Sequence, residues 1–320
     1  MMKQILIFML LAMAWHYGSA QQRAQFSQYM NNDYIFNPAA GGTEDYADIK
    51  ASFRKQWLGM SAGPITYYVS GHTPIGKMRG KPHPRNKSRS HHSIGGIAYQ
   101  DVTGPSSRLG LSGSYSYNMQ FTETIRGAIG TFIGMQQYSI DGSKLAFHDA
   151  GENTQIQRKT VPDLGLGIWM YSNRVYLGIS SFQFTQSKLN FNLSETGKEK
   201  TMYSKLTHHF FMTTGVKIPV TDDITFIPSA MVKIVNTAPP SIDLNAKLRF
   251  KDLFWVGASY RHLDSFIGLA GVTINSRVDI GYSYDATVSP LGKYNTGSHE
   301  ILVGVRIKDK GKVICPSNFW

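Results

Sequence analysis

The stretch from Ala47 to Arg54 alternates strictly between apolar and polar side chains. Odd positions are apolar and even positions are polar or charged: Ala47, Ile49, Ala51 and Phe53 against Asp48, Lys50, Ser52 and Arg54. A period of two residues is typical of a β-strand with one apolar and one wet face. The wet face does not fit an ordinary hydrophobic core, because each charge there needs a buried partner. Two folds remain: a soluble sandwich with this face in solvent, or a membrane barrel with this face lining the lumen.

The first twenty residues are typical of a secretory signal peptide. Lys3 supplies a positive start, an apolar run follows from Ile5 to Trp15, and Gly18-Ser19-Ala20 supplies the small residues of a cleavage site. The apolar run is too short to span a bilayer. We therefore expect an exported protein that begins at Gln21, which excludes nuclear and cytoplasmic nucleic-acid roles despite a formal charge of +12. The single cysteine, Cys315, allows no internal disulfide.

Thirteen further segments show strand patterns, and the last third of the chain is a meander. The expected strands cover 47–57, 64–73, 93–101, 108–120, 123–138, 163–171, 174–184, 206–218, 223–235, 240–250, 253–262, 265–274, 277–287 and 297–307. Their lengths are close to the ~9–11 residues that cross a bilayer at a tilt. The total of fourteen is even, as an antiparallel outer-membrane barrel requires.

The connections between these strands sort by parity, which favours the barrel over the sandwich. Two long polar loops, 139–162 and 185–205, fall at the same end, whereas five of the six connections at the other end are tiny. Outer-membrane barrels show this difference between external loops and periplasmic turns, and a soluble sandwich has no reason for it. The exception is the basic run at 74–92. Either a strand early in the chain is miscounted, or this run is a periplasmic docking loop.

A barrel of this strand number leaves an aqueous lumen unless something fills it. The segment 21–46 has no clean period but is rich in aromatic residues, so we expect it to form a plug or a periplasmic strap. The transmembrane β-barrel then covers 47–307, and a periplasmic tail covers 308–320. The residues expected in the lumen or the plug are Phe26, Gln28, Tyr29, Asn37, Asp48, Lys50, Arg54, Asp243, Lys247, Arg249, Arg261, Asp285 and Glu300.

Three other groups of side chains are expected to have no catalytic or metal-binding role. Aromatic residues near the expected strand ends are assigned to an interfacial girdle: Trp57, Tyr67, Tyr68, Tyr99, Tyr115, Tyr117, Trp169, Trp255 and Tyr284. The histidines lack the spacing and the carboxylate neighbours of a metal site, so they are expected to be solvated: His72, His83, His91, His92, His208 and His209. A serine, histidine and aspartate set of the kind that hydrolases use could be chosen from Ser70, His72 and Asp101, but many such sets could be chosen in this chain. No enzyme, metal or cofactor is expected.

Several motifs, taken together, resemble one protein family. They are FSQYM, FNPAAGG, FRKQWLGMSAGPITYYVSGHTP, DLNAKLRF, FWVGASYR, IGYSYD and GSHEI, in this order between Gln25 and Ile307. This combination resembles the PorP/SprF family, outer-membrane proteins of the type IX secretion system and of gliding motility in Bacteroidota. The ending CPSNFW resembles the SprF side more than the PorP side.

The resemblance implies a barrel in the cell outer membrane that helps to export and anchors a large surface adhesin. The implied partners are outer-membrane lipid, the C-terminal domain of the secreted adhesin, and periplasmic lipoprotein-ring and motor components. The residues expected to bind partners are Lys77, Arg79, Lys81, Arg85, Lys87, Arg89, Phe319 and Trp320. Composition and architecture alone leave a second function open, a passive porin for small solutes.

Overall fold

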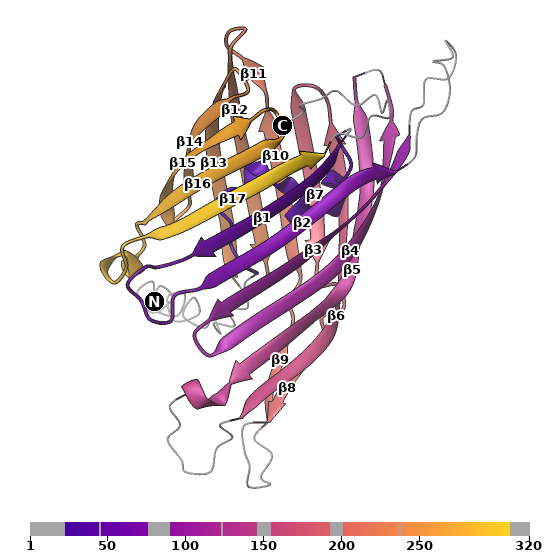
Figure 1. Cartoon of the computed structure of the whole chain (residues 1–320). Helices are drawn as coiled ribbons and strands as arrows, with labels where there is room; N and C mark the ends of the chain where they lie inside the picture. Colours follow the sequence, from indigo (N-terminus) through magenta and orange to yellow (C-terminus); the bar gives the residue numbers. More distant parts are fainter. Residues whose placement is uncertain are drawn as a thin grey trace, which may run out of the picture.

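The computed structural model describes residues 23–44, 46–75, 90–122, 124–145, 155–192, 201–236 and 238–307. Within these ranges fourteen strands close into an antiparallel barrel, which confirms the predicted fold and strand number (Figure 1). The signal peptide expected at 1–20, most of the basic run and the tail 308–320 lie outside the described residues.

The barrel strands follow the chain order around the wall, and β1 closes the ring by pairing with β17 from Ala47↔Ile307 to Lys55↔His299. Their bounds are β1 (Ala47–Lys55), β2 (Ile65–Ile75), β3 (His91–Thr103), β4 (Ser106–Gln120), β5 (Arg126–Asp141), β6 (Ile156–Tyr171), β7 (Val175–Phe182), β10 (His209–Val216), β12 (Ile224–Val235), β13 (Ala238–Phe250), β14 (Phe254–Arg261), β15 (Ser265–Ile274), β16 (Val278–Thr287) and β17 (Ser298–Ile307). The short β11 (Ile218–Pro219) pairs with β12 beyond the end of β10. The described part of the chain also contains five 3-10 turns: η1 (Tyr29–Asn31), η2 (Asp33–Ile35), η3 (Pro38–Ala40), η4 (Gly142–Lys144) and η5 (Pro290–Lys293).

The barrel wall is apolar on the outside and carries many polar side chains on the inside, beside an apolar cluster that includes Phe132, Phe182 and Phe211. On β4, Leu109 and Leu111 point outward and are 51% and 68% exposed, whereas Arg108 and Ser112 are buried in the interior. This distribution is the inverse of a soluble protein and is what a barrel in lipid requires. In the described part of the chain, no helix is long and apolar enough to cross a membrane.

The two ends of the barrel differ, and we name them by their connections. The loop end carries the connections 56–64, 104–105, 142–155, 183–208, 236–237, 262–264 and 288–297. The turn end carries 76–90, 121–125, 172–174, 217–223, 251–253 and 275–277. Because fourteen strands are found, a miscounted strand no longer explains the basic run, which belongs to the connection between β2 and β3 at the turn end.

Both loops predicted to be long and polar contain strand. β5 extends to Asp141 and β6 begins at Ile156, so both ends of 139–162 continue the barrel sheet. The loop 185–205 contains a hairpin of β8 (Lys188–Asn192) and β9 (Thr201–Lys205), which projects at the loop end (Figure 1). Leu189 and Phe191 of β8 are buried against Val161, with Tyr138 and Ile140 packed alongside. This small apolar cluster stabilises the projection, and the polar composition of the loop concealed it.

The predicted aromatic girdle is wrong for four of its nine members. Tyr68, Tyr99, Trp169 and Trp255 are buried inside the barrel, at 8% exposure or less. Side-chain parity along each strand accounts for this, because Tyr68 shares a face with the buried, inward-pointing Thr66 and Ser70. The neighbouring Tyr67 points outward, as predicted.

Candidate functional site in the barrel interior

The N-terminal segment 23–44 crosses the barrel interior from the loop end to the turn end. At the loop end, the Arg23 backbone N–H donates to His209 Nε2 at 3.4 Å, and its guanidinium lies 3.9 Å from the ring centroid of Phe182. His209 begins β10 and Phe182 ends β7, so both mark the loop end. The segment continues through η1, η2 and η3 and enters β1 at the turn end.

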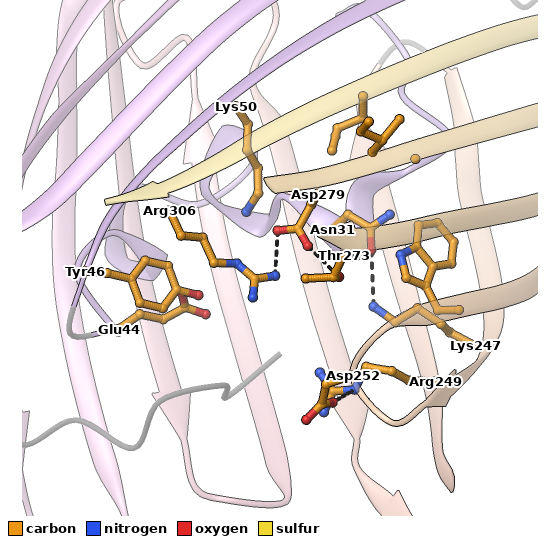
Figure 2. Close-up of a pocket in the computed structure, with 14 residues that line it drawn as sticks. Asn31, Glu44, Tyr46, Lys50, Lys247, Arg249, Asp252, Thr273, Asp279 and Arg306 are labelled. Atoms are coloured by element: carbon orange, nitrogen blue, oxygen red, sulfur yellow. Dashed lines mark hydrogen bonds and ion pairs between the residues drawn. The ribbon is translucent and has the colours of Figure 1, made fainter. Parts of the chain in front are cut away.

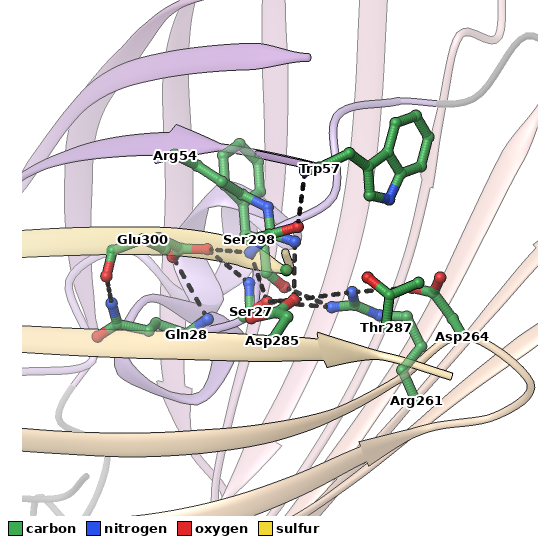
Figure 3. A network of polar contacts seen from close by, with 12 residues as sticks. Ser27, Gln28, Arg54, Trp57, Arg261, Asp264, Asp285, Thr287, Ser298 and Glu300 are labelled. Atoms are coloured by element: carbon green, nitrogen blue, oxygen red, sulfur yellow. Dashed lines mark hydrogen bonds and ion pairs between the residues drawn. The ribbon is translucent and has the colours of Figure 1, made fainter. Parts of the chain in front are cut away.

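A buried polar network holds the first part of this segment near the loop end (Figure 3). Arg54 of β1 donates to Asp285 of β16 at 2.8 Å and to Glu300 of β17 at 3.1 Å. Ser27 lies between these groups: its Oγ donates to Asp285 at 2.6 Å and accepts from Arg54 at 2.6 Å. Its backbone N–H donates to Glu300 Oε2 at 2.7 Å. One serine of the segment therefore completes an ion-pair network between three strands.

A second guanidinium extends the network around the wall. Arg261 of β14 pairs with Asp243 at 3.0 Å, with Asp264 at 3.3 Å and with Asp285 at 3.4 Å. It also donates to the carbonyl oxygen of Phe26 at 3.3 Å. Removing one member of such a buried network leaves the opposite charge without a partner, which is strongly destabilising.

The next residues of the segment use backbone acceptors and ring packing. Gln28 Nε2 donates to the Glu300 carbonyl at 3.2 Å, and the Tyr29 hydroxyl donates to the Asp243 carbonyl at 3.4 Å. The Phe26 ring packs edge-on against Tyr68 at a centroid distance of 4.9 Å. All the residues predicted for the lumen or plug lie on the segment or face the interior, although their roles stay predictions.

A row of small side chains on the wall receives the middle of the segment. The row consists of register partners on β3 to β7: Ser93, Ser116, Gly130, Gly167 and Ser180. We call it the small-residue row. A Cβ atom added to Gly130 would lie 2.6 Å from the Ala39 backbone nitrogen, and one added to Gly167 would lie 2.0 Å from Asn37 Oδ1. The wall is therefore shaped to the segment at this level.

Hydrogen bonds fix the segment over this row. Asn37 Nδ2 donates to the backbone carbonyls of Ile168 at 3.0 Å and Ile179 at 3.2 Å, and Ser180 Oγ donates to the Phe36 carbonyl at 2.5 Å. Asn37 also begins η3, because its side chain accepts from the Ala39 N–H at 3.0 Å. The Asn-Pro pair thus both caps a turn and anchors it to the wall.

Two histidines hold the glycine pair that follows. The Gly42 N–H donates to His72 Nδ1 at 3.2 Å, and the Gly42 carbonyl lies 2.6 Å from His91 Nε2. Gly42 has φ +72°, and a Cβ there would collide with Ser93, so only glycine fits. The prediction that the histidines are solvated is therefore wrong for His72, His91 and His209, which are at most 9% exposed.

A cavity of about 60 Å³ lies at the turn end, lined largely by charges (Figure 2). Three of its cations pair nearby: Arg306 with Asp279 at 2.5 Å, Arg249 with Asp252 at 2.7 Å, and Lys50 with Asp48 at 2.5 Å. The fourth, Lys247, donates to Asn31 Oδ1 of the segment at 3.2 Å. Glu44 also lines the cavity, and burial, together with the charge of Asp48, raises the pKa of its carboxyl.

The hydrolase trio is not assembled. Ser70 Oγ accepts from Asn32 at 3.0 Å, His72 binds Gly42, and Asp101 accepts from Thr66 at 2.7 Å. No group of three or more potential metal ligands occurs in the described ranges. The predicted partner-binding residues, the six cations of 77–89 and the terminal Phe319 and Trp320, lie outside the described residues.

The sequence of residues 18–305 matches a family model described as type IX secretion system membrane protein PorP/SprF. The chain belongs to this family. It is accordingly a membrane protein of type IX secretion, and its apolar outer wall and polar interior place this PorP/SprF barrel in the outer membrane. Among curated proteins, no relative matches the sequence.

Solved structures of other barrels are similar to this PorP/SprF chain at low identity. A FadL homologue of Pseudomonas aeruginosa shares 10% identity, with a TM-score of 0.49 over 85% of this chain and 92% of that one. The toluene transporter TbuX of Ralstonia pickettii shares 8%, with a TM-score of 0.48 over 86% and 92%. The translocator domain of the autotransporter NalP from Neisseria meningitidis shares 12%, with a TM-score of 0.44 over 88% and 95%.

Sequence reasoning placed the charged wall residues that hold the segment, such as Arg54, Arg261 and Glu300, inside this PorP/SprF barrel, but it missed the serines and histidines. Ser27 was in a quoted motif but had no assigned role, and Ser116, Ser180, His72 and His91 were not assigned to the interior site. Parity within each strand would have placed them inside, because His72 lies on the same face as the buried Ser70. The segment residue that each one bonds could not be inferred, since these contacts join distant parts of the chain.

We expect Arg54→Ala to destabilise the protein by about 3–5 kcal/mol, because it leaves Asp285 and Glu300 buried with one cation fewer. Urea unfolding of the protein in detergent or lipid measures this loss. Arg54→Lys is the matched control. It keeps the positive charge but not the planar guanidinium that bonds both carboxylates, so we expect a smaller loss of stability. An unfolding curve for Arg54→Ala that matches the wild type would contradict the importance of the network.

We expect Gly130→Ala to loosen the segment from the small-residue row, because the added Cβ meets backbone atoms of Pro38 and Ala39. Ala40→Cys in a Cys315→Ser background reports this by maleimide labelling, which becomes faster when the segment detaches. Gly268→Ala is the control, since a Cβ there has no neighbour within 4 Å. Equal labelling rates in the two variants would show that the segment does not depend on this fit.

Proposed function

We propose that this PorP/SprF protein belongs to the SprF-like, gliding branch of the family. In this proposal it helps to export a large surface adhesin and anchors it at the loop end. Its turn end contacts the periplasmic lipoprotein ring and motor components. The family match carries the proposal as far as type IX secretion, and the difference between the two ends supports a division of partners between them.

We further propose that the segment 23–44 plugs the lumen. Contacts along its whole length support this proposal, from Arg23 at the loop end through Ser27 and Asn37 to Gly42 near the turn end. A passive porin needs an open water-filled path. A barrel whose lumen holds a segment bonded to the wall at several levels is poorly suited to be a passive porin. We therefore prefer the anchoring function.

The loop end is the proposed adhesin face. Its support is the amount of structure that projects there: the extensions of β5 and β6 and the β8–β9 hairpin, with Leu189 and Phe191 packed in a cluster of their own. A packed projection offers a partner a preorganised surface, whereas a flexible loop loses conformational entropy when it binds.

The turn end is the proposed periplasmic docking face. The described turns there are short, and the basic run between β2 and β3 carries Lys77, Arg79, Lys81, Arg85, Lys87 and Arg89 without an acidic residue among them. A concentration of one charge sign favours an acidic partner and makes the interaction sensitive to salt.

Deleting residues 23–44 tests the plug. We expect single-channel conductance in planar bilayers to rise well above that of the full chain, because the polar lumen then fills with water. Retained barrel closure is checked by heat-dependent gel mobility, and Gly130→Ala serves as a milder variant that leaves the chain intact. If neither variant with a closed barrel conducts more than the wild type, the segment is not the plug.

Two variants separate the proposed faces in a pull-down of the detergent-solubilised protein. Replacing 187–206 by a short turn removes the β8–β9 hairpin, and we expect loss of the adhesin but not of ring components. Changing all six cations of 77–89 to glutamine is expected to release the ring components, most clearly at low salt, and to keep the adhesin. Each variant is the control for the other. Solute-selective conductance of the wild type, with no protein partner recovered, would favour the passive porin.

A further inference from the structure

A groove of about 470 Å³ lies on the outer, membrane-facing surface of the barrel. It is bounded by two neighbouring outward rows of register partners on β4, β5, β6, β7 and β10. One row is Tyr115, Thr131, Leu166, Ser181 and Phe210, and the other includes Tyr117, Ile129, Ile168 and Ile179. Its volume and its almost wholly apolar walls are those of a ligand site.

The groove exists because of residue size in the first row. Thr131 and Ser181 are small, and they stand between the larger Tyr115, Leu166 and Phe210. Gly130, Gly167 and Ser180 of the inward small-residue row also line it, because they form its floor. The wall is thus thin at the level where Asn37 bonds to it from the inside.

The two ends of the groove differ in whether their hydroxyl groups have hydrogen-bond partners. Ser181 is the penultimate residue of β7, close to the loop end, and is 7% exposed. Its hydroxyl has no hydrogen-bond partner among the described residues. At the opposite end, Tyr115 and Tyr117 pack against His92, with ring centroids 5.8 and 5.0 Å away, and the Tyr115 hydroxyl lies 2.6 Å from His92 Nδ1. An unpartnered buried hydroxyl costs free energy unless a ligand supplies the missing bond.

We propose that this groove binds one acyl chain of an outer-membrane lipid, with the ester end of the chain at Ser181. From Ser181 to Tyr115 the row spans three strand-to-strand steps, or about 14 Å at ~4.8 Å each, so it suits an extended hydrocarbon chain. The walls offer no charge to recognise an ion or a polar peptide, and in the membrane this face contacts lipid. The Ser181 hydroxyl donates its hydrogen to the ester carbonyl oxygen, and Tyr115 and Tyr117 close the far end.

Native mass spectrometry of the detergent-purified protein, titrated with diacyl phosphatidylethanolamine, tests the proposal. Thr131→Trp fills the middle of the groove, and we expect it to lower lipid retention about tenfold or more, since displacing two methylene groups suffices for that change. Ala270→Trp is the control, an outward-facing position on β15 away from the groove. Both variants must show wild-type heat-dependent gel mobility. Equal retention in Thr131→Trp and Ala270→Trp would overturn the site.

The role of Ser181 has its own readout. We expect the wild type to retain the diacyl lipid better than its diether analogue, which lacks the ester carbonyls, by a few-fold. Ser181→Ala is expected to lose this preference while it still binds both lipids. No preference in the wild type would remove Ser181 from the site, and displacement of the phospholipid by an equal concentration of free fatty acid would show that the groove takes a different ligand.

Discussion

Two buried guanidinium groups, those of Arg54 and Arg261, determine how the interior of this barrel is organised. The carboxylates of Asp243, Asp285 and Glu300 face inward from three strands, and none is more than 4% exposed. Such charges are tolerated only where cations and hydrogen-bond donors surround them. The strands supply the cations, and the segment supplies Ser27. The barrel wall and the N-terminal segment are therefore parts of one electrostatic unit.

Shape complements charge further along the segment. The small-residue row leaves space on the inside of the wall, and the Asn37-Pro38-Ala39 turn fills it. The same strands carry large apolar side chains on the outside, because successive residues of a strand point to opposite faces. The small-residue row and the outer groove thus arise from one alternating pattern. Its small residues face the segment, and the large side chains that border the groove face lipid.

The sequence predicted the fold well where the signal is local. Alternation along Ala47–Arg54 and Asp243–Arg249 identified both faces of the wall, and strand length and loop parity identified the barrel. The errors have physical causes. Tyr68 and Trp255 were assigned outward because aromatic type was weighed above parity, and β8–β9 was missed because a few apolar contacts outweigh a polar composition. The partners within the interior could not be predicted: Ser27 and Asp285 are 258 residues apart, and no local pattern encodes their contact.

The N-terminal segment links parts of the barrel wall that are far apart around the ring. A strand wall is stiff along its hydrogen-bonded ladders, but on its own a wide lumen leaves opposite sides of the ring connected only through the wall. Here Arg54 on β1 and Arg261 on β14 both contact the segment near the loop end, while Ser180 on β7 and Ser116 on β4 bond it from the other side. The segment therefore braces opposite sides of the ring and joins the two ends of the barrel by a continuous backbone. The bonds that hold the segment are distributed around the wall and along the axis, so its position does not depend on any single strand.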